Sequence, residues 1–279
     1  MNWNNFIEQA LAEDVREGDH TSLSCISNDA NGSARLLIKD TGILAGVELA
    51  EKIFFHLSPQ IQFTKILNDG TEMQSGQIAF ELAGNARAIL TGERLALNCM
   101  QRMSGIATLT NQFVKMVEGT QAKILDTRKT TPLFRAAEKW AVKIGGGENH
   151  RFGLFDMILI KDNHIDYAGG IVNAIEAVKR YLLEKNLQLK VEIEARTLID
   201  VALIMTTGGV DRIMLDNFSL SNLQQAVNLI NRKFETEASG GVTLETVRAI
   251  AETGVDYISV GALTHSYQSC DMSLKANIN

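Results

Sequence analysis

The sequence is poor in proline and cysteine. Only two prolines occur, Pro59 and Pro132, which excludes a long proline-rich linker. The three cysteines, Cys25, Cys99 and Cys270, are odd in number and form no Cys-x-x-Cys pair. A disulfide framework and a zinc site are therefore not expected, and this cysteine usage is typical of a reducing compartment. We predict a cytoplasmic protein.

Segments that direct a chain to or through a membrane are also missing. The first stretch, MNWNNFIEQALAEDV, has no basic region followed by an apolar run, so it is not interpreted as a signal peptide. No apolar run approaches the ~20 residues that are needed to cross a bilayer. We expect no membrane partner.

The chain has no excess of positive charge. Its formal net charge is −6, and general nucleic-acid binding needs a basic surface, so we expect no nucleic-acid partner. The charge is unevenly distributed, because residues 123–162 hold eight Lys or Arg against five Asp or Glu, a local +3, which leaves −9 for the rest. A locally basic stretch in an acidic chain indicates a small anionic ligand.

The hydrophobic pattern of the first third predicts short helices and strands. We expect helices at 5–12 and 48–57, strands at 34–39, 61–67 and 77–82, and a long helical stretch at 87–117 with a break near Gly105. With 279 residues, of which 45% are hydrophobic and 22% charged, the chain is long enough for one large globular domain or two modest ones.

After about residue 120, short apolar runs alternate with helical stretches. The runs are 123–125, 157–160, 190–193, 212–215, 234–238 and 257–260. Apolar strands that alternate with helices predict a parallel sheet covered by helices. Because chemically capable residues follow each of the six runs, we favour an α/β barrel, where all strand ends meet on one face, over a doubly wound sheet.

Basic residues follow the first of these strands. Arg128 offers a planar fork that matches a carboxylate, and Lys129 is a compact charge that suits phosphate. His150 and Arg151 come after three consecutive glycines, which allow a close approach to a ligand or a mobile loop. Solvated surface loops remain the alternative for both segments.

Lys161 ends the apolar strand Met-Ile-Leu-Ile and must reach a polar face. It either binds an anion or is a desolvated amine that forms a Schiff base. Further along, the alternation of Glu192 and Glu194 with apolar neighbours points both carboxylates toward the barrel interior or mouth. Glu194 and Asp216 on adjacent strand ends could hold Mg²⁺, although a buried ion pair is the alternative.

Small residues close the last two strands. Ser239, Gly240 and Gly241 follow one strand, and Gly261 follows the next. Loops after the final strands of such barrels often bind phosphate through backbone N–H groups, so we predict a phosphate site here rather than ordinary turns.

Ten segments carry a family resemblance. They are ALAEDVREGDHTS, GILAGVELA, TGERLALNCMQRMSGIAT, ILDTRKTTP, EKWAVKIGGGENHRFGL, ILIKDNHI, VEIEA, MLDNF, EASGGVTLETV and ISVGALTHS. On these segments, in order and over nearly the whole chain, the sequence closely resembles the quinolinate phosphoribosyltransferases, also called nicotinate-nucleotide pyrophosphorylases (carboxylating). One departure is Leu133 after Pro132, where family members usually have Gly.

The resemblance implies an N-terminal α/β sandwich at 1–106, completed by about 266–279, and a TIM-like α/β barrel of about seven strands at 107–265. It implies a pentosyltransferase of de novo NAD biosynthesis. Such an enzyme converts quinolinate and phosphoribosyl pyrophosphate (PRPP) to nicotinate mononucleotide, pyrophosphate and CO₂. The cofactor would be Mg²⁺, and the assembly a homodimer or higher homo-oligomer with shared active sites.

The resemblance also implies roles for individual residues. Quinolinate binding falls to Arg94, Arg128, His150, Arg151 and Lys161, with Arg94 donated by a neighbouring subunit. Binding of PRPP falls to Lys129, Glu194, Asp216, Ser239, Gly240, Gly261 and His265, and Mg²⁺ binding to Glu194 and Asp216. The catalytic residues would be Lys129, Lys161, Glu194 and Asp216.

Three other functions stay open at this point. A Schiff-base barrel such as an aldolase would use Lys161. A phosphometabolite-binding regulator would not need the carboxylates of Glu194 and Asp216. A paralogue could transfer the phosphoribosyl group to a different base.

Overall fold

The computed structural model describes residues 2–277, and the chain divides into two compact units. The first unit comprises residues 1–111, 131–146 and 266–279, and the second comprises 112–130 and 147–265. The segment 131–146, which we had assigned to the barrel domain, groups with the first unit by its contacts. No helix among the described residues has both the length and the apolar character needed to cross a membrane.

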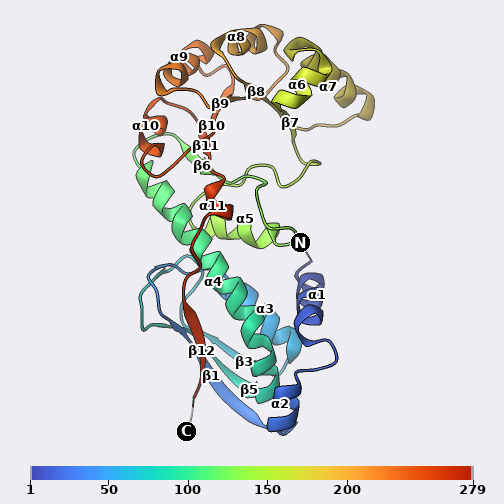
Figure 1. The fold of residues 1–279 in the computed structure, drawn as a ribbon, viewed down its shortest axis with the longest axis vertical. Helices are drawn as coiled ribbons and strands as arrows, with labels where there is room; N and C mark the ends of the chain where they lie inside the picture. The colour runs from blue at the N-terminus through green and yellow to red at the C-terminus, as the bar shows by residue number, and fades with distance from the viewer. Residues whose placement is uncertain (1, 278–279) are drawn as a thin grey trace. The chain divides into compact units, whose positions relative to one another are not determined.

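The first unit is built on a four-stranded antiparallel sheet in the order β12-β1-β5-β3 (Figure 1). Its strands are β1 (Asn31–Ile38), β3 (Gln62–Lys65), β5 (Ile78–Asn85) and β12 (Met272–Ala276). The strands predicted at 34–39, 61–67 and 77–82 are thus confirmed. The sequence reading missed β12, which pairs with β1 from near the C-terminus, and the short pair β2 (Gly42–Ile43) and β4 (Glu72–Met73).

The helices of the first unit include a long one that continues into the second unit. They are α1 (Trp3–Val15), α2 (His20–Cys25), α3 (Val47–Leu57), α4 (Ala86–Met116) and α5 (Arg135–Ile144). The expected break of α4 near Gly105 is wrong, because the helix runs through it. A Cβ atom on Gly105 would collide with the carbonyl oxygen of Gln268, so this glycine serves close packing rather than a bend.

The loop before α5 explains the departure at Leu133. Leu133 has a backbone φ of +63° and a side chain that is 82% exposed. Glycine adopts this left-handed conformation without strain, whereas a residue with a Cβ does so at a cost of about 1–2 kcal/mol. The glycine that is usual in the family therefore suits this position.

The second unit contains a six-stranded parallel sheet in the order β6-β11-β10-β9-β8-β7. The strands are β6 (Lys123–Leu125), β7 (Ile158–Ile160), β8 (Val191–Ala195), β9 (Arg212–Asp216), β10 (Glu235–Ser239) and β11 (Tyr257–Ser259). All six apolar runs are confirmed as strands. In the described residues the barrel has these six strands rather than seven, with an isolated bridge between Leu125 and Glu148 beside β6.

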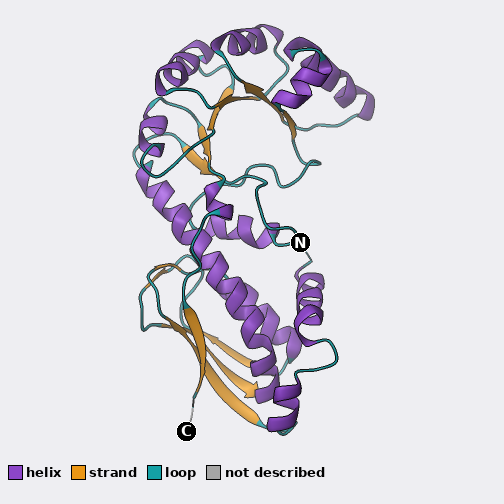
Figure 2. Ribbon diagram, viewed as in Figure 1, coloured by secondary structure: helices purple, strands orange, loops and turns teal. Residues whose placement is uncertain are grey.

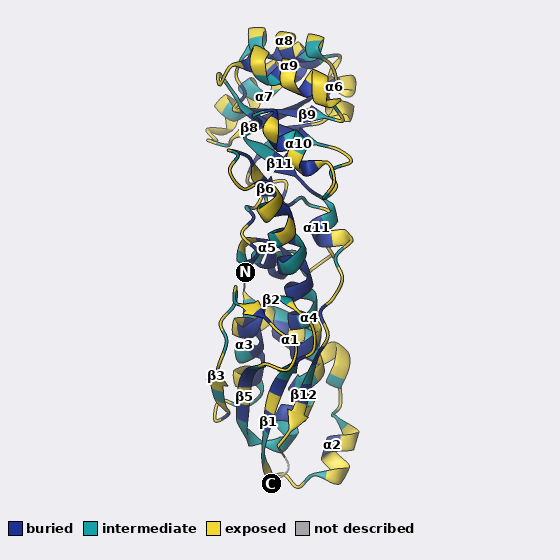
Figure 3. Cartoon of the chain, turned by 90° about the vertical axis from the view of Figure 1, so that its left-hand side faces the viewer, coloured by how far each residue is buried: buried dark blue, intermediate teal, exposed yellow. Residues whose placement is uncertain are grey.

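Helices cover the outer side of this sheet. They are α6 (Asp162–Ala168), α7 (Ile171–Lys185), α8 (Leu198–Thr207), α9 (Leu220–Ile230) and α10 (Val247–Glu252). The short helix α11 (Ala262–His265) follows β11 and is not one of these outer helices. The strands form an arc with α6 to α10 on its outside (Figure 2). Exposed residues are frequent on the helices α6 to α9, whereas the strands β8 and β9 beneath them are mostly buried (Figure 3).

Strand register stacks the inward side chains of this unit in layers. Arg212 of β9 lies level with Glu192 of β8 and Glu235 of β10. One layer higher, Glu194 and Glu237 lie level with Met214. Since side chains alternate between the two faces of a strand, both glutamates of β8 and both of β10 face the barrel interior.

Candidate active site

A cavity of about 730 Å³ opens at the carboxyl ends of the strands in the second unit. Eleven of the twelve predicted site residues line it: Arg128, Lys129, His150, Arg151, Lys161, Glu194, Asp216, Ser239, Gly240, Gly261 and His265. Parallel strands that close into a barrel bring their carboxyl ends to one face, which is why residues up to 137 positions apart meet there. The twelfth, Arg94, is an exposed residue of α4 in the first unit.

Two guanidinium groups form one wall of the cavity. The Nε atom of Arg128 is buried and has no hydrogen-bond partner among the described residues. Arg151 donates from Nη1 to the carbonyl oxygen of Met157 at 3.2 Å. Burial lowers the pKa of the Arg151 guanidinium, and the nearby charge of Arg128 lowers it further. Two neighbouring cations that repel one another are stabilised by an anion that accepts from both.

Carboxylates form another wall. Glu194 accepts from Nζ of Lys161 at 2.8 Å and from the backbone N–H of Asp162 at 2.8 Å. Burial raises the pKa of Asp216, and the charge of Glu194 raises it further. Two carboxylates close enough to repel one another suit a hard divalent cation, so Glu194 and Asp216 fit Mg²⁺.

The environment of Lys161 argues against a Schiff base. Its ammonium group forms an ion pair with Glu194, and the side chain is 46% exposed. A Schiff-base lysine is activated by desolvation in an apolar pocket or by a neighbouring cation. A solvated ammonium held by a carboxylate is better suited to binding an anion.

Glycines shape the third wall. Gly240 has a φ of +97°, and a Cβ atom there would collide with the side-chain amide of Asn217. A Cβ atom on Gly261 would lie 3.0 Å from Nε2 of His265 and 3.1 Å from Cδ of Lys129. The absence of side chains thus lets the backbone approach a ligand and brings Lys129 and His265 together, as a phosphate site requires.

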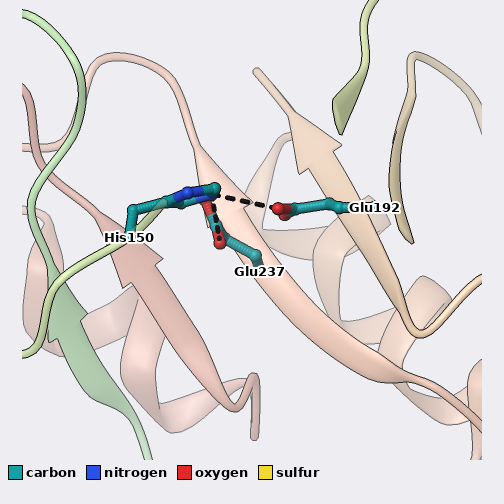
Figure 4. A group of neighbouring side chains, drawn as sticks. All are labelled: His150, Glu192 and Glu237. Carbon is teal, nitrogen blue, oxygen red and sulfur yellow. Dashed lines mark ion pairs between the residues drawn. The ribbon is translucent and has the colours of Figure 1, made fainter. Parts of the chain in front are cut away.

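A buried cluster lies in the barrel core and reaches the cavity. Nε2 of His150 is 3.0 Å from an oxygen of Glu192 and 3.4 Å from an oxygen of Glu237 (Figure 4). Arg212 donates to the same oxygen of Glu237 from Nη1 at 2.9 Å. Both glutamates are completely buried, and His150 is 9% exposed.

The protonation of this cluster follows from its contacts. Burial raises the pKa of Glu192 to about 7, and the charge of Glu237 adds to the shift. Burial by itself would lower the pKa of His150, whereas the two carboxylates favour the protonated ring and raise the pKa. The backbone N–H of Arg151, however, donates to Nδ1 at 2.7 Å. In this conformation the ring therefore carries its proton on Nε2, and a second proton can bind only after that amide turns away.

The sequence reading did not single out Glu237 or Arg212 as site residues. The signal for Glu237 was the alternation Glu-Thr-Glu-Ala-Ser of β10, which matches that of β8 and points Glu235 and Glu237 inward. No local pattern marks Arg212, because it stands at the start of its strand and acquires its partners through register with β10.

Fold and cavity together define a class of protein: an α/β barrel whose mouth is lined by cations, a carboxylate pair and glycine-rich loops, which are groups suited to small anionic ligands. The chain belongs to the quinolinate phosphoribosyl transferase family. The family model for the C-terminal domain matches residues 106–275, and that for the N-terminal domain matches residues 19–104.

Curated relatives match along most of their length. The chain is 49% identical over 284 aligned positions to the chloroplastic nicotinate-nucleotide pyrophosphorylase (carboxylating) of Arabidopsis thaliana, covering 96% of this chain and 81% of that protein. It is 42% identical over 267 positions to the probable nicotinate-nucleotide pyrophosphorylase (carboxylating) of Bacillus subtilis strain 168, covering 96% and 91%.

A solved structure is similar as well. The nicotinate-nucleotide pyrophosphorylase of Francisella tularensis superposes with a TM-score of 0.90 at 40% sequence identity. The superposition covers 99% of this chain and 96% of that one. The α/β class of the fold, with a barrel-type parallel sheet and a separate antiparallel domain, is thereby confirmed.

Proposed function

We propose that this chain is a quinolinate phosphoribosyltransferase. It joins quinolinate to PRPP and releases nicotinate mononucleotide, pyrophosphate and CO₂, a reaction of de novo NAD biosynthesis. The observation that carries this proposal is that one cavity is lined both by a guanidinium pair, Arg128 and Arg151, and by a carboxylate pair, Glu194 and Asp216. A dicarboxylate fits the first pair, and a diphosphate with its metal fits the second.

The residues of the cavity suit each step of the reaction. Arg128, Arg151 and Lys161 hold the two carboxylates, so that the pyridine nitrogen faces C1 of the ribose. Lys129 stabilises the pyrophosphate as it leaves, and Glu194 stabilises the positive charge that develops on the ribose. Attack by the nitrogen makes the ring an electron sink. The neighbouring carboxylate then departs as CO₂, and a proton takes its place.

Mg²⁺ is part of this proposal. Glu194 and Asp216 would hold it, and when bound it would neutralise the diphosphate charge. The Lys161 ammonium pairs with Glu194, so Lys161 would leave that glutamate in order to hold a substrate carboxylate.

The direct test is turnover. The protein, incubated with quinolinate, PRPP and Mg²⁺, should produce nicotinate mononucleotide and CO₂ in equal amounts. Lys161→Ala should lose nearly all of this activity. The matched control is Lys179→Ala, which removes an exposed ion pair with Glu176 on α7 and should retain activity. Nicotinate should be a poor substitute, because its single carboxylate leaves a cation unpaired at a cost of about 1–3 kcal/mol. Equal turnover of both acids would contradict the assignment.

We also propose that the chain acts in the cytoplasm as a homodimer or higher homo-oligomer. Family members resemble this chain in the segment that carries Arg94, and the resemblance assigns that arginine to the site of a neighbouring subunit. Support comes from the first unit, where Arg94 is an exposed residue whose apolar helix neighbours Leu97 and Met100 are buried. Size-exclusion chromatography with light scattering should show no monomer.

A further inference from the structure

The cluster in the barrel core contains ionisable groups that the proposed reaction does not use. Of this cluster, only Glu237 and His150 line the cavity, whereas Glu192 and Arg212 do not. Burying two carboxylates is costly unless each has a partner. Their retention in a barrel interior, where apolar side chains would pack without that cost, requires an explanation.

The two carboxylates are not equivalent. Glu237 has Arg212 as a cationic partner, since Nη1 of Arg212 donates to it at 2.9 Å. Neither oxygen of Glu192 has a hydrogen bond of good geometry among the described residues, and its closest polar contact is Nε2 of His150 at 3.0 Å. Glu192 thus contacts His150 directly and acts on Arg212 only through its charge, whereas Glu237 also accepts a hydrogen bond from Arg212.

A metal ion is the alternative occupant of this cluster. One ligand atom each from His150, Glu192 and Glu237 lies within 4.8 Å of the others, which is close enough to surround a cation. The ring nitrogens argue against it. Because Nδ1 accepts the N–H of Arg151, the ring proton is on Nε2, and a protonated nitrogen cannot bind a metal. In metal sites the other ring nitrogen instead donates its proton to an acceptor.

The His150 ring connects the barrel core to Arg151. Residues 149–157 contain neither helix nor strand, so no backbone ladder orients this part of the cavity wall. It is held by side chains. Asp126 accepts from the backbone N–H of His150 at 2.8 Å, and the ring of His150 accepts from the backbone N–H of Arg151. The ring therefore holds the Arg151 backbone together with the bonds that Asp156 accepts from the next two backbone N–H groups.

We infer that Glu192, supported by Glu237, is a positioning residue: it orients the His150 ring from the barrel core and thereby places Arg151 against the dicarboxylate. This inference rests on the proposed function for its substrate. It predicts that a change at Glu192 affects quinolinate binding selectively, although Glu192 itself does not line the cavity.

Two variants separate the hydrogen-bond acceptor from the charge. Glu192→Gln keeps the size and an acceptor for Nε2–H, while Glu192→Met keeps the size and removes the acceptor. We expect Glu192→Met to raise the KM for quinolinate about tenfold, through the loss of the 3.0 Å polar contact that orients the ring, with Glu192→Gln close to wild type. The KM for PRPP and kcat should change by less than about twofold in both, because uniform binding of one substrate is what is lost.

The matched control is Glu235→Gln. Like Glu237, Glu235 accepts a hydrogen bond from Arg212, at 3.1 Å, but its side chain is 35% exposed. The carboxylates paired with His150 are those of Glu192 and Glu237. Glu235→Gln should leave the KM for quinolinate unchanged. If all three variants raise the KM equally, or if none does, the positioning role of Glu192 is wrong.

A spectroscopic test does not depend on activity. In protein with ¹⁵N-labelled histidine rings, the His150 resonances, assigned with His150→Gln, should show a protonated Nε2 and an unprotonated Nδ1 at neutral pH. A proton on Nδ1 alone would overturn the inference. So would one zinc or other transition ion bound per chain whose removal reproduces the Glu192→Met effect. Because this test is independent of turnover, a protein that failed to use quinolinate but had this tautomer would contradict the proposed function and not the placement of the ring.

Discussion

Replacing Arg128 by Lys tests the guanidinium wall without removing its charge. The buried Nε of Arg128 has no partner among the described residues, so the guanidinium has a donor available for a ligand. An arginine fork can donate two parallel hydrogen bonds to one carboxylate, whereas a lysine is a point charge. The loss of one hydrogen bond to a charged group costs about 1.5–3 kcal/mol, which corresponds to about a 10- to 150-fold lower kcat/KM for quinolinate.

The assay is steady-state turnover with quinolinate varied and both PRPP and Mg²⁺ saturating, accompanied by calorimetric titration of quinolinate alone. Arg248→Lys is the matched control, because Arg248 forms an exposed ion pair with Glu252 on α10. Its kinetics should not change. An Arg128→Lys enzyme with wild-type affinity for quinolinate would refute a bidentate contact, and so would an equal loss in both variants.

Four further outcomes are expected. Glu138→Ala should lower the free energy of unfolding by about 3 kcal/mol in a urea titration, because the buried carboxylate of Glu138 pairs with Arg102, whose charge would be left uncompensated. A change within about 0.5 kcal/mol would contradict this. Burial raises the pKa of the Cys99 thiol to about 12, so iodoacetamide at about pH 8 should label exposed Cys25 and leave Cys99 unmodified in native protein, as seen by peptide mass spectrometry. EDTA should abolish turnover and Mg²⁺ restore it, and activity that survives chelation would count against the metal. Mixed Arg94→Ala and Lys161→Ala chains should regain about a quarter of wild-type activity after random subunit exchange, from one intact site in half of the dimers; exchange without recovery would show that Arg94 does not act across subunits.

Most of the barrel could be predicted because its signals are local. An apolar strand is recognisable within five residues, and the residue that follows a strand lies at the catalytic face whichever strands are its neighbours. That is why Lys161, Glu194 and Asp216 could be placed around one cavity from the sequence. The roles of these residues came from the family resemblance, since a lysine or a glutamate at a strand end suits several chemistries.

Errors and omissions occurred where distant segments meet. Gly105 was interpreted as a break in α4, because a glycine that permits close packing cannot be told from one that bends a helix without knowing what approaches it. No local pattern marked β12 as a strand, since it pairs with β1 from the other end of the chain; that about 266–279 completes the first domain was implied by the family resemblance alone.

What the sequence by itself determined is the strand–helix alternation, the inward direction of alternate side chains and the set of polar residues at the strand ends. These follow from periodicity and steric preference within a few neighbouring residues. Only the tertiary structure decided that Glu192, Glu237 and Arg212 meet His150 in the barrel core. That meeting depends on the register between β8, β9 and β10 and on the path of an irregular loop. Both are set by the packing of segments far apart in the chain, which no local pattern records.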